Sequence, residues 1–131
     1  MSTFKLEIVT PTRILDEGMI TYVRCPGLDG SFGVMTNHAS AIIAMDVGEI
    51  KITRENRDYY IATGGGFADI QGDTVLLLVE SAEEANEINI ARAESAVERA
   101  KERLKQNKGI DEKRAMMAIS RALNRMKVAK R

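Results

Sequence analysis

Residues 74–104, TVLLLVESAEEANEINIARAESAVERAKERL, contain the point at which the pattern of the whole chain changes. Residues 75–79 of this stretch form a short apolar run, as buried strands do. From about residue 88 the apolar residues recur every three or four positions instead, which is the period of an amphipathic helix. We therefore predict an α+β protein with two domains, a β domain over residues 1–85 and a helical domain over residues 86–131.

The part before this change has the alternation of half-buried strands. Phe4, Leu6 and Ile8 fall on one face of the first segment, and Lys5 and Glu7 fall on the other. Turn-forming residues separate the segments that follow. About nine short strands without a helical interval indicate an antiparallel sandwich or flattened barrel and exclude a parallel βαβ fold. The expected strands are residues 4–10, 13–16, 19–24, 32–35, 42–45, 48–53, 58–63, 67–71 and 74–80.

The part after the change predicts two helices. A break is expected at residues 105–109, where Gly109 suits a helix end, and Asp111 suits the start of a second helix that runs to about Lys127. The short link favours an antiparallel hairpin, and the alanine stripes allow the helix axes to approach closely. Because small residues bury little area, the packing energy is modest and the hairpin could open. The stripes are Ala93, Ala96, Val97, Ala100 and Leu104 on the first helix and Ala115, Ala118, Ile119, Ala122, Met126 and Ala129 on the second.

Composition divides at the same place. The 131 residues carry no net charge, but residues 1–85 sum to −7 and residues 86–131 to +7, which indicates a charged partner such as nucleic acid, anionic lipid or an acidic protein. The longest apolar run, residues 75–79, is far short of the roughly 20 residues of a membrane span. One cysteine, Cys25, and the lack of a leader before Phe4 favour a reducing compartment, the cytoplasm.

Residues that could carry catalysis do not form a recognisable group. His38 has no cysteine or carboxylate neighbour at a metal-ligand spacing, which favours a structural or interface role. The triple glycine 64–66 lacks the Gly-Lys-Ser/Thr ending of a phosphate-binding loop and opens a strand, so it is read as a turn. Cys25 has no basic helix terminus to activate it. The sequence predicts neither a catalytic residue nor a metal site.

The second helix is basic, with no acidic residue after Glu112. Arg114, Arg121 and Arg125 are spaced to share one face. One interpretation is internal neutralisation of a like-charged row on the first helix, formed by Glu94, Glu98 and Glu102. The other is that the guanidinium groups converge on phosphate or on an acidic partner.

Four landmarks in this order resemble the epsilon subunits of bacterial F-type ATP synthases over essentially the whole length. They are LEIVTP at 6–11, GSFGVMTNHA at 30–39, GGGF at 64–67 and the closing basic hairpin. The resemblance implies a ten-stranded sandwich followed by a two-helix hairpin. It also implies a non-catalytic rotor subunit in the central stalk, on the cytoplasmic face of the bacterial cell membrane, that couples proton translocation to ATP synthesis.

The resemblance also implies partner contacts and excludes direct membrane insertion. The sandwich would contact the gamma subunit and the c-ring through a loop over residues 29–33 and through His38. Many relatives have a glutamate where this chain has Ser31, so the charged contact to the ring is not expected here. The residues assigned to the gamma subunit and c-ring are Asp29, Gly30, Ser31, Phe32, Gly33 and His38.

The hairpin in this family is a switch that permits hydrolysis when folded on the sandwich and blocks the rotor when extended. In the extended state Arg114, Arg121 and Arg125 would meet an acidic segment of the catalytic beta subunits, within the ring of alpha and beta subunits. Some relatives bind ATP as a regulatory ligand, although no cofactor is required. Asn89 replaces the aspartate of their motif; the matching positions are Ile88, Asn89, Arg92, Ala93, Arg99, Arg121 and Arg125.

An alternative is a sandwich that carries a basic hairpin for nucleic acid. Nucleic-acid surfaces usually add aromatic stacking, and no Phe, Tyr or Trp follows Phe67. The two interpretations differ in one observable, since only the alternative predicts salt-dependent retardation of oligonucleotides. The sequence favours protein partners and no nucleic acid.

Overall fold

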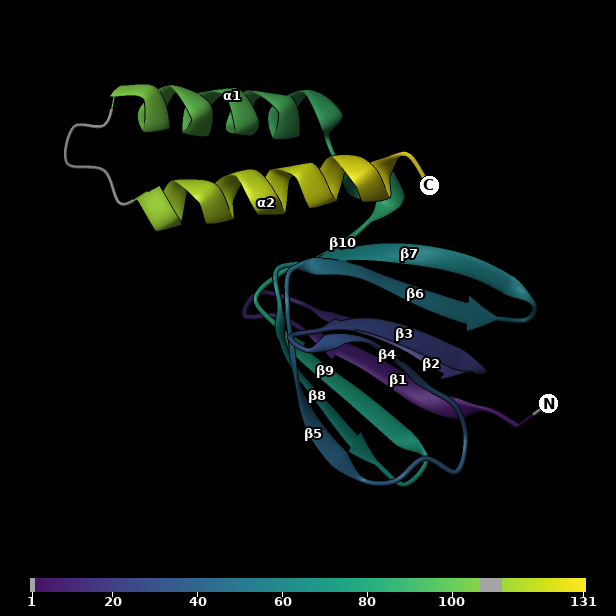
Figure 1. The fold of residues 1–131 in the computed structure, drawn as a ribbon. Helices are drawn as coiled ribbons and strands as arrows, with labels where there is room; N and C mark the ends of the chain where they lie inside the picture. The colour runs from purple at the N-terminus through teal and green to yellow at the C-terminus, as the bar shows by residue number, and fades with distance from the viewer. Residues whose placement is uncertain (1, 107–111) are drawn as a thin grey trace.

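The computed structural model describes residues 2–106 and 112–131. Ten strands precede the helices, as the resemblance implies, and Figure 1 shows them stacked below the helical hairpin. The strands are β1 Phe4–Val9, β2 Ile14–Ile20, β3 Tyr22–Gly27, β4 Gly30–Val34, β5 Ala41–Met45, β6 Gly48–Arg54, β7 Arg57–Thr63, β8 Gly66–Gln71, β9 Thr74–Val79 and β10 Ala82–Glu84.

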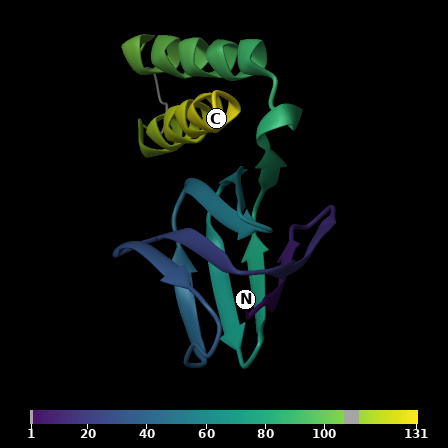
Figure 2. The same ribbon diagram turned by 90° about the vertical axis from the view of Figure 1, so that its right-hand side faces the viewer.

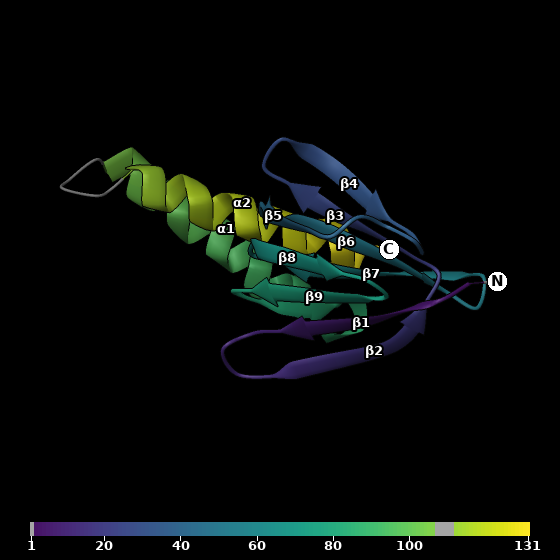
Figure 3. The same ribbon diagram turned by 90° about the horizontal axis from the view of Figure 1, so that it is seen from below.

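The strands form one hydrogen-bonded sheet that folds over on itself as a sandwich. Its order is β10-β7-β6-β3-β5-β8-β9-β1-β2, with β4 paired to β3 outside this path. Seen from below in Figure 3, β4 and β2 lie on opposite sides of the sandwich. All pairs are antiparallel as predicted, apart from β1 and β9, which run parallel with Lys5 opposite Thr74 and Val9 opposite Leu78.

Two strand boundaries differ from the prediction because glycines lie within strands. Residues 13–24 do not form two strands divided near Gly18. Gly18 has φ +69° and lies in β2, where the register with β1 shifts between Leu6 and Glu7, so it forms a bulge instead of a turn. The actual break between β2 and β3 is at Thr21. Likewise β4 begins at Gly30 instead of Phe32.

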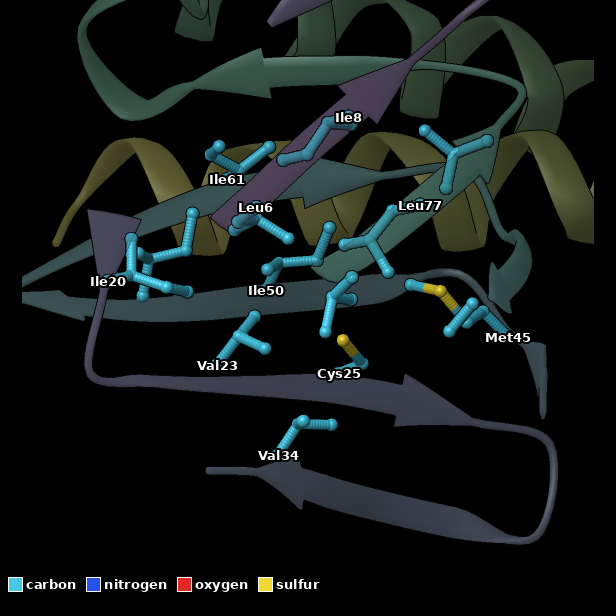
Figure 4. Close-up of a cluster of buried hydrophobic side chains, with 14 of the residues drawn as sticks. Leu6, Ile8, Ile20, Val23, Cys25, Val34, Met45, Ile50, Ile61 and Leu77 are labelled. Carbon is cyan, nitrogen blue, oxygen red and sulfur yellow. The ribbon is translucent and has the colours of Figure 1, made fainter. Parts of the chain in front are cut away.

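The main core lies between the two layers of the folded sheet. Figure 4 shows side chains from β1, β2, β3, β6, β7 and β9 directed toward one another. Alternate residues of each strand supply this core, as the period of two requires. The largest fully buried side chains of the cluster are Phe4, Leu6, Ile8, Ile20, Ile50, Ile52, Ile61, Leu77, Val23, Val75 and Cys25.

A short 3-10 turn, η1 (Ala85–Glu87), connects the sandwich to the hairpin of α1 (Ile90–Gln106) and α2 (Glu112–Ala129). α1 starts two residues later than predicted because Asn89 is its N-cap: the Asn89 Oδ1 accepts a hydrogen bond from the Arg92 amide at 3.1 Å. Lys105 and Gln106, predicted as a break, still belong to α1. The predicted Gly109 helix end and Asp111 helix start lie outside the described residues.

The two helices are antiparallel, and α2 lies between α1 and the sandwich (Figures 1 and 2). Five residues of the predicted stripes are buried, namely Ala93, Val97, Ala100, Ala115 and Ala122. A small second core of Ala62, Ile88 and Val128 joins α2 to the sandwich. Neither helix of the described residues is apolar enough over a sufficient length to cross a membrane.

Candidate partner-binding surfaces

An apolar row crosses the outer face of the sheet. In the strand register, each residue of this row lies opposite the next one on the neighbouring strand. The row runs through Ala44 of β5, Phe67 of β8, Leu78 of β9, Val9 of β1 and Ile14 of β2. Phe67 is 54% exposed and Ile14 is 65% exposed. Because five neighbouring strands contribute, these side chains form a continuous outer row, which is the pattern of a partner surface.

The sequence contained a signal for this row that the strand assignments did not use. Strand β9 is apolar at every position from Val75 to Val79, whereas a strand with one solvated face alternates. Val75, Leu77 and Val79 point into the main core, so Leu76 and Leu78 point outward. Apolar side chains on both faces of a strand indicate that both faces are covered when the protein functions.

The predicted loop over residues 29–33 is not a loop. Residues Gly30–Val34 form β4, and only the Leu28–Asp29 pair makes the turn between β3 and β4. Gly27 and Gly30 close this hairpin: a Cβ on Gly27 would lie 2.5 Å from the Gly30 carbonyl oxygen. Ser31 and Gly33 are exposed, whereas Phe32 packs partly against the main core.

His38 follows the other end of β4, so the strand separates it from the Leu28–Asp29 turn. Its Nδ1 lies 2.5 Å from the Met35 carbonyl oxygen, and its ring meets the Phe4 ring edge-on with centroids 5.5 Å apart. Its Nε2 is buried and has no hydrogen-bond partner among residues 2–106 and 112–131. A cavity of about 440 Å³ adjoins the ring and is also lined by Asn37 and Asp73. The predicted contact residues therefore divide into two groups at opposite ends of β4.

A second cavity, of about 320 Å³, lies between the hairpin and the sandwich. Arg121 and Arg125 of α2 line it together with Ala96 of α1 and Thr63 of β7. Arg125 is already paired, since its Nε and Nη2 donate to the two carboxylate oxygens of Glu83 at 2.6 and 3.0 Å. This cavity is where the structure brings predicted nucleotide-binding residues together.

The other predicted nucleotide-binding residues lie elsewhere. Arg92 and Arg99 are exposed on α1 and are not part of the cavity lining. Ile88 and Ala93 are buried, Ile88 in the second core, and Asn89 caps α1. The replacement of aspartate by Asn89 therefore preserves a helix cap, because either side chain can accept the bond from the Arg92 amide.

The basic face of α2 is divided in the same way. Arg114 is exposed on the first turn, at the end of the hairpin that projects beyond the sandwich (Figures 1 and 3). Arg121 and Arg125 lie over the sandwich instead, and both are half-buried. Arg125 and Arg131 pair with carboxylates of the sandwich. The opposite charges of the two domains thus meet in the folded chain.

Near the end of the chain, Arg131 donates from Nε to Oε2 of Glu49 at 3.1 Å and from Nη2 to Oε1 at 2.5 Å. Burial alone would raise the pKa of Glu49, but the hydrogen bonds of Arg131 and the charges of Arg131, Lys127 and Arg24 hold that pKa below its usual range. Arg24 approaches the same carboxylate at 3.5 Å. Glu49 is therefore a carboxylate shared between the sandwich and α2.

Within residues 2–106 and 112–131, no group of three His, Cys, Asp or Glu side chains is arranged to hold a metal ion. Burial raises the pKa of the Cys25 thiol to about 12, so this thiol is not activated. The exposed apolar row has the character of a surface that another protein covers, and the basic helix is docked on the sandwich. Together with the fold they define a subunit that works by binding.

The comparisons agree with this class. The sandwich matches the family model described as ATP synthase, Delta/Epsilon chain, beta-sandwich domain over residues 3–85. The hairpin matches ATP synthase, Delta/Epsilon chain, long alpha-helix domain over residues 86–130. The chain belongs to the ATP synthase delta/epsilon chain family. This membership confirms the resemblance, and with it a non-catalytic stalk subunit of the complex.

Relatives of similar length support the assignment. An ATP synthase epsilon chain of Desulforamulus reducens is 36% identical over 129 residues, 97% of each chain. One of Nitratidesulfovibrio vulgaris is 40% identical over 124 residues, 94% of this chain and 92% of that one. A chain in the mitochondrial ATP synthase of Euglena gracilis has the same fold, with a TM-score of 0.80 at 16% identity, over 92% of this chain and 77% of that one.

Proposed function

We propose that this chain is a rotor subunit in the central stalk of an F-type ATP synthase, on the cytoplasmic face of a bacterial cell membrane. It transmits torque between proton translocation and ATP synthesis. The observation that carries this proposal is the outer row of Phe67, Leu78 and Ile14, because an exposed apolar row across five strands requires a protein partner. The partner on this face is the gamma subunit.

The end of the sandwich that carries His38 is assigned to the c-ring. A partner that enters the cavity beside His38 supplies the hydrogen bond that the buried Nε2 lacks. The Leu28–Asp29 turn, with Gly30, Ser31, Phe32 and Gly33, provides a second contact at the other end of β4. With Ser31 in place of a glutamate, this contact is neutral.

The hairpin is assigned the role of a conformational inhibitor of ATP hydrolysis. Its support is the kind of contact that it makes with the sandwich, which is largely polar: two arginine–carboxylate pairs, a hydrogen bond from Asn124 to Gly48, and a small core around Ala62, Ile88 and Val128. When the hairpin extends, Arg121 and Arg125 become available to an acidic segment of a beta subunit, together with Arg114. The same opposite-charge pairing would then serve both positions of the hairpin.

ATP is proposed as a regulatory ligand of the cavity between hairpin and sandwich. A triphosphate there would draw on Arg121 and Arg125, and Arg125 would exchange Glu83 for a phosphate oxygen. Calorimetry of the full chain with MgATP tests this, with Arg121→Gln expected to weaken binding and exposed Lys113→Gln as the matched control. Absence of heat at millimolar MgATP would contradict it.

The decisive test of the stalk function is reconstitution with an epsilon-depleted F-type ATPase. The double variant Phe67→Ser, Leu78→Ser is expected to bind about tenfold or more weakly, because each side chain forfeits roughly 1.5–3 kcal/mol of burial. Gln71→Ser, exposed on the same strand β8, is the control and should bind as the parent does. Equal binding of all three chains would remove the outer row from the interface.

The brake is tested in the same system by ATP hydrolysis. The full chain is expected to restrain hydrolysis, whereas a chain ending at Ala85 binds without restraining it, provided that circular dichroism shows its sandwich intact. If neither chain inhibits, the sandwich is a coupling part and the charge asymmetry serves folding alone.

Family membership favours this stalk function over the nucleic-acid alternative, which oligonucleotide retardation would test.

A further inference from the structure

Within the described residues, the hairpin contacts the sandwich near one of its ends. α2 packs on β6, β7 and η1, while α1 lies on the far side of α2 (Figures 1 and 2). The hydrogen bonds, ion pairs and buried side chain that join α2 to the sandwich come from its last two turns and the residues after it. Asn124 donates to the Gly48 carbonyl oxygen at 2.6 Å, Arg125 pairs with Glu83, and Val128 is fully buried.

On the other side of the same end, an exposed ion pair ties η1 to the sandwich. Arg13 donates to both carboxylate oxygens of Glu87 at 2.8 Å, and Glu87 also accepts from the Glu84 amide in a capping box. This fixes η1 to the sandwich, so a hairpin that moves must turn after Glu87. Ile88 and Asn89, which are extended or capping residues between η1 and α1, are the first positions free to act as the hinge.

Arg131 fastens the hairpin beside this hinge. Besides its two hydrogen bonds to Glu49, its guanidinium lies 4.4 Å from the centre of the Tyr60 ring, which is a cation–π contact. The Glu49 side chain is only 7% exposed, so its charge is costly without a partner. Arg24 of β3, at 3.5 Å, remains with Glu49 when Arg131 leaves. The sandwich therefore keeps a paired carboxylate in either state of the hairpin.

We propose that Arg131, held by Glu49 and Tyr60, is the latch that keeps the hairpin folded on the sandwich, and that its release lets the hairpin leave the sandwich by turning at residues 88–89. This inference rests on the proposed function of the hairpin as a switch. It adds which residues set the balance between the two positions. The latch and the hinge lie at the same end of the hairpin, so release of Arg131 acts directly beside the turning point.

Thiol accessibility in the isolated full chain tests the latch. Ala62 lies beneath the hairpin at 3% exposure, and Ala62→Cys places a thiol there with a small change of volume. The native Cys25 is 1% exposed in the main core and has a pKa of about 12, so it stays unreactive toward a disulfide reagent such as dithiobis(nitrobenzoate). The rate at which the introduced thiol reacts then reports how often the hairpin lifts.

In the Ala62→Cys background we expect Arg131→Gln and Glu49→Gln each to raise this rate about fivefold to tenfold, a range set by the partial exposure of Arg131. Lys130→Gln removes the same charge one residue earlier and is expected to leave the rate unchanged. A rate for Arg131→Gln equal to that of Lys130→Gln would overturn the latch. If both variants raised the rate equally, general charge attraction would hold the hairpin in place of a specific contact, which would also overturn the latch.

Hydrogen exchange of chains that retain Ala62 provides a second reading in case Ala62→Cys disturbs docking. In Arg131→Gln the amides of residues 88–89 should exchange faster, while those of β1 and β9 stay protected. No difference from the parent would overturn the latch. Neither measurement uses an ATPase, so failure here leaves the stalk function standing. A hairpin that opens in Arg131→Gln without altering hydrolysis after reconstitution would contradict the proposed brake and leave the latch intact.

Discussion

The sandwich and the hairpin are built from different amounts of buried apolar area. Fully buried Phe, Leu and Ile side chains from five strands fill the main core, whereas alanine and valine are the buried residues of α1 and α2. A buried leucine contributes roughly 1.5–3 kcal/mol, and an alanine contributes much less. The difference shows how one short chain combines a body that must transmit force with an arm that can detach.

The largest effect is expected where the main core is emptied. Leu6 is fully buried on β1, and Leu6→Ala should lower the free energy of unfolding by about 2–5 kcal/mol, because the neighbouring strands cannot close the cavity completely. Denaturant unfolding followed by circular dichroism measures it. A loss below about 1 kcal/mol would show that the sandwich tolerates cavities as a loosely packed domain does.

A change in the opposite direction tests the close approach of the helices. Ala100 is buried between α1 and α2, and Ala100→Leu inserts three carbons where the helix axes lie close together. We expect the helical part to lose about 1–3 kcal/mol while the sandwich keeps its stability. Hydrogen exchange resolves the two parts separately. Equal destabilisation of both would mean that they unfold as a single cooperative unit.

Glu17 shows that the sandwich also contains a buried charge. Burial raises its pKa, although the Tyr59 hydroxyl, which donates to Oε2 at 2.9 Å, acts in the other direction. Because the folded-state pKa is raised, Glu17 contributes stability below its unfolded pKa, and this is lost as the pH rises through the folded value. Glu17→Gln should therefore stabilise the chain by about 1 kcal/mol at pH 7, a Tm increase of a few degrees.

The sign of this effect is checked by repeating the thermal unfolding in acid. Near pH 4 the parent carboxyl is largely protonated in both states, so the advantage of Glu17→Gln should disappear. A variant that is less stable than the parent at pH 7 would show that the ionised carboxylate, beside Arg54 at 4.0 Å, stabilises the fold instead.

The smallest effect concerns the joint between the two regions. The hydrogen bonds from Arg13 lower the pKa of Glu87 to about 2, and the opposing effect of burial is weaker. The pair therefore contributes stability above the unfolded pKa of about 4.5. This stability is lost as the pH falls toward 2. Both side chains are more than one third exposed, so Glu87→Gln should cost less than about 1 kcal/mol at pH 7. Difference titration of the Tm between pH 7 and 2 measures it.

Local patterns were sufficient to predict most of the fold. Alternation located nine of the ten strands, and the alanine stripes located both helices, because these features depend on near neighbours in the sequence. The short β10 was not among the predicted strands. The parallel pairing of β1 with β9 was not predictable in this way, since register between distant strands depends on the packed layers. Gly18 was misread as a break because a bulge glycine and a turn glycine look alike in sequence.

The candidate surfaces were less predictable than the fold. The motif around His38 was visible, but not that β4 separates it from the Leu28–Asp29 turn. Arg125 was identified by its spacing, whereas its partner Glu83 and the latch at Arg131 depend on how α2 lies across the sandwich. Val128 was missed because only the apolar stripe that faces α1 was assigned to the core, whereas this residue faces the sandwich.

The parallel pair of β1 and β9 also governs when the protein can assemble during synthesis. It joins the first strand to nearly the last strand of the sandwich, so this contact closes the longest loop in the domain. A chain still being translated cannot complete the sandwich until residues 74–79 have left the ribosome. The edge of β1 that pairs with β9 stays open while almost the entire sandwich is synthesised. The contacts between the two helices are closer in sequence, so the helices can pair soon after their own residues emerge.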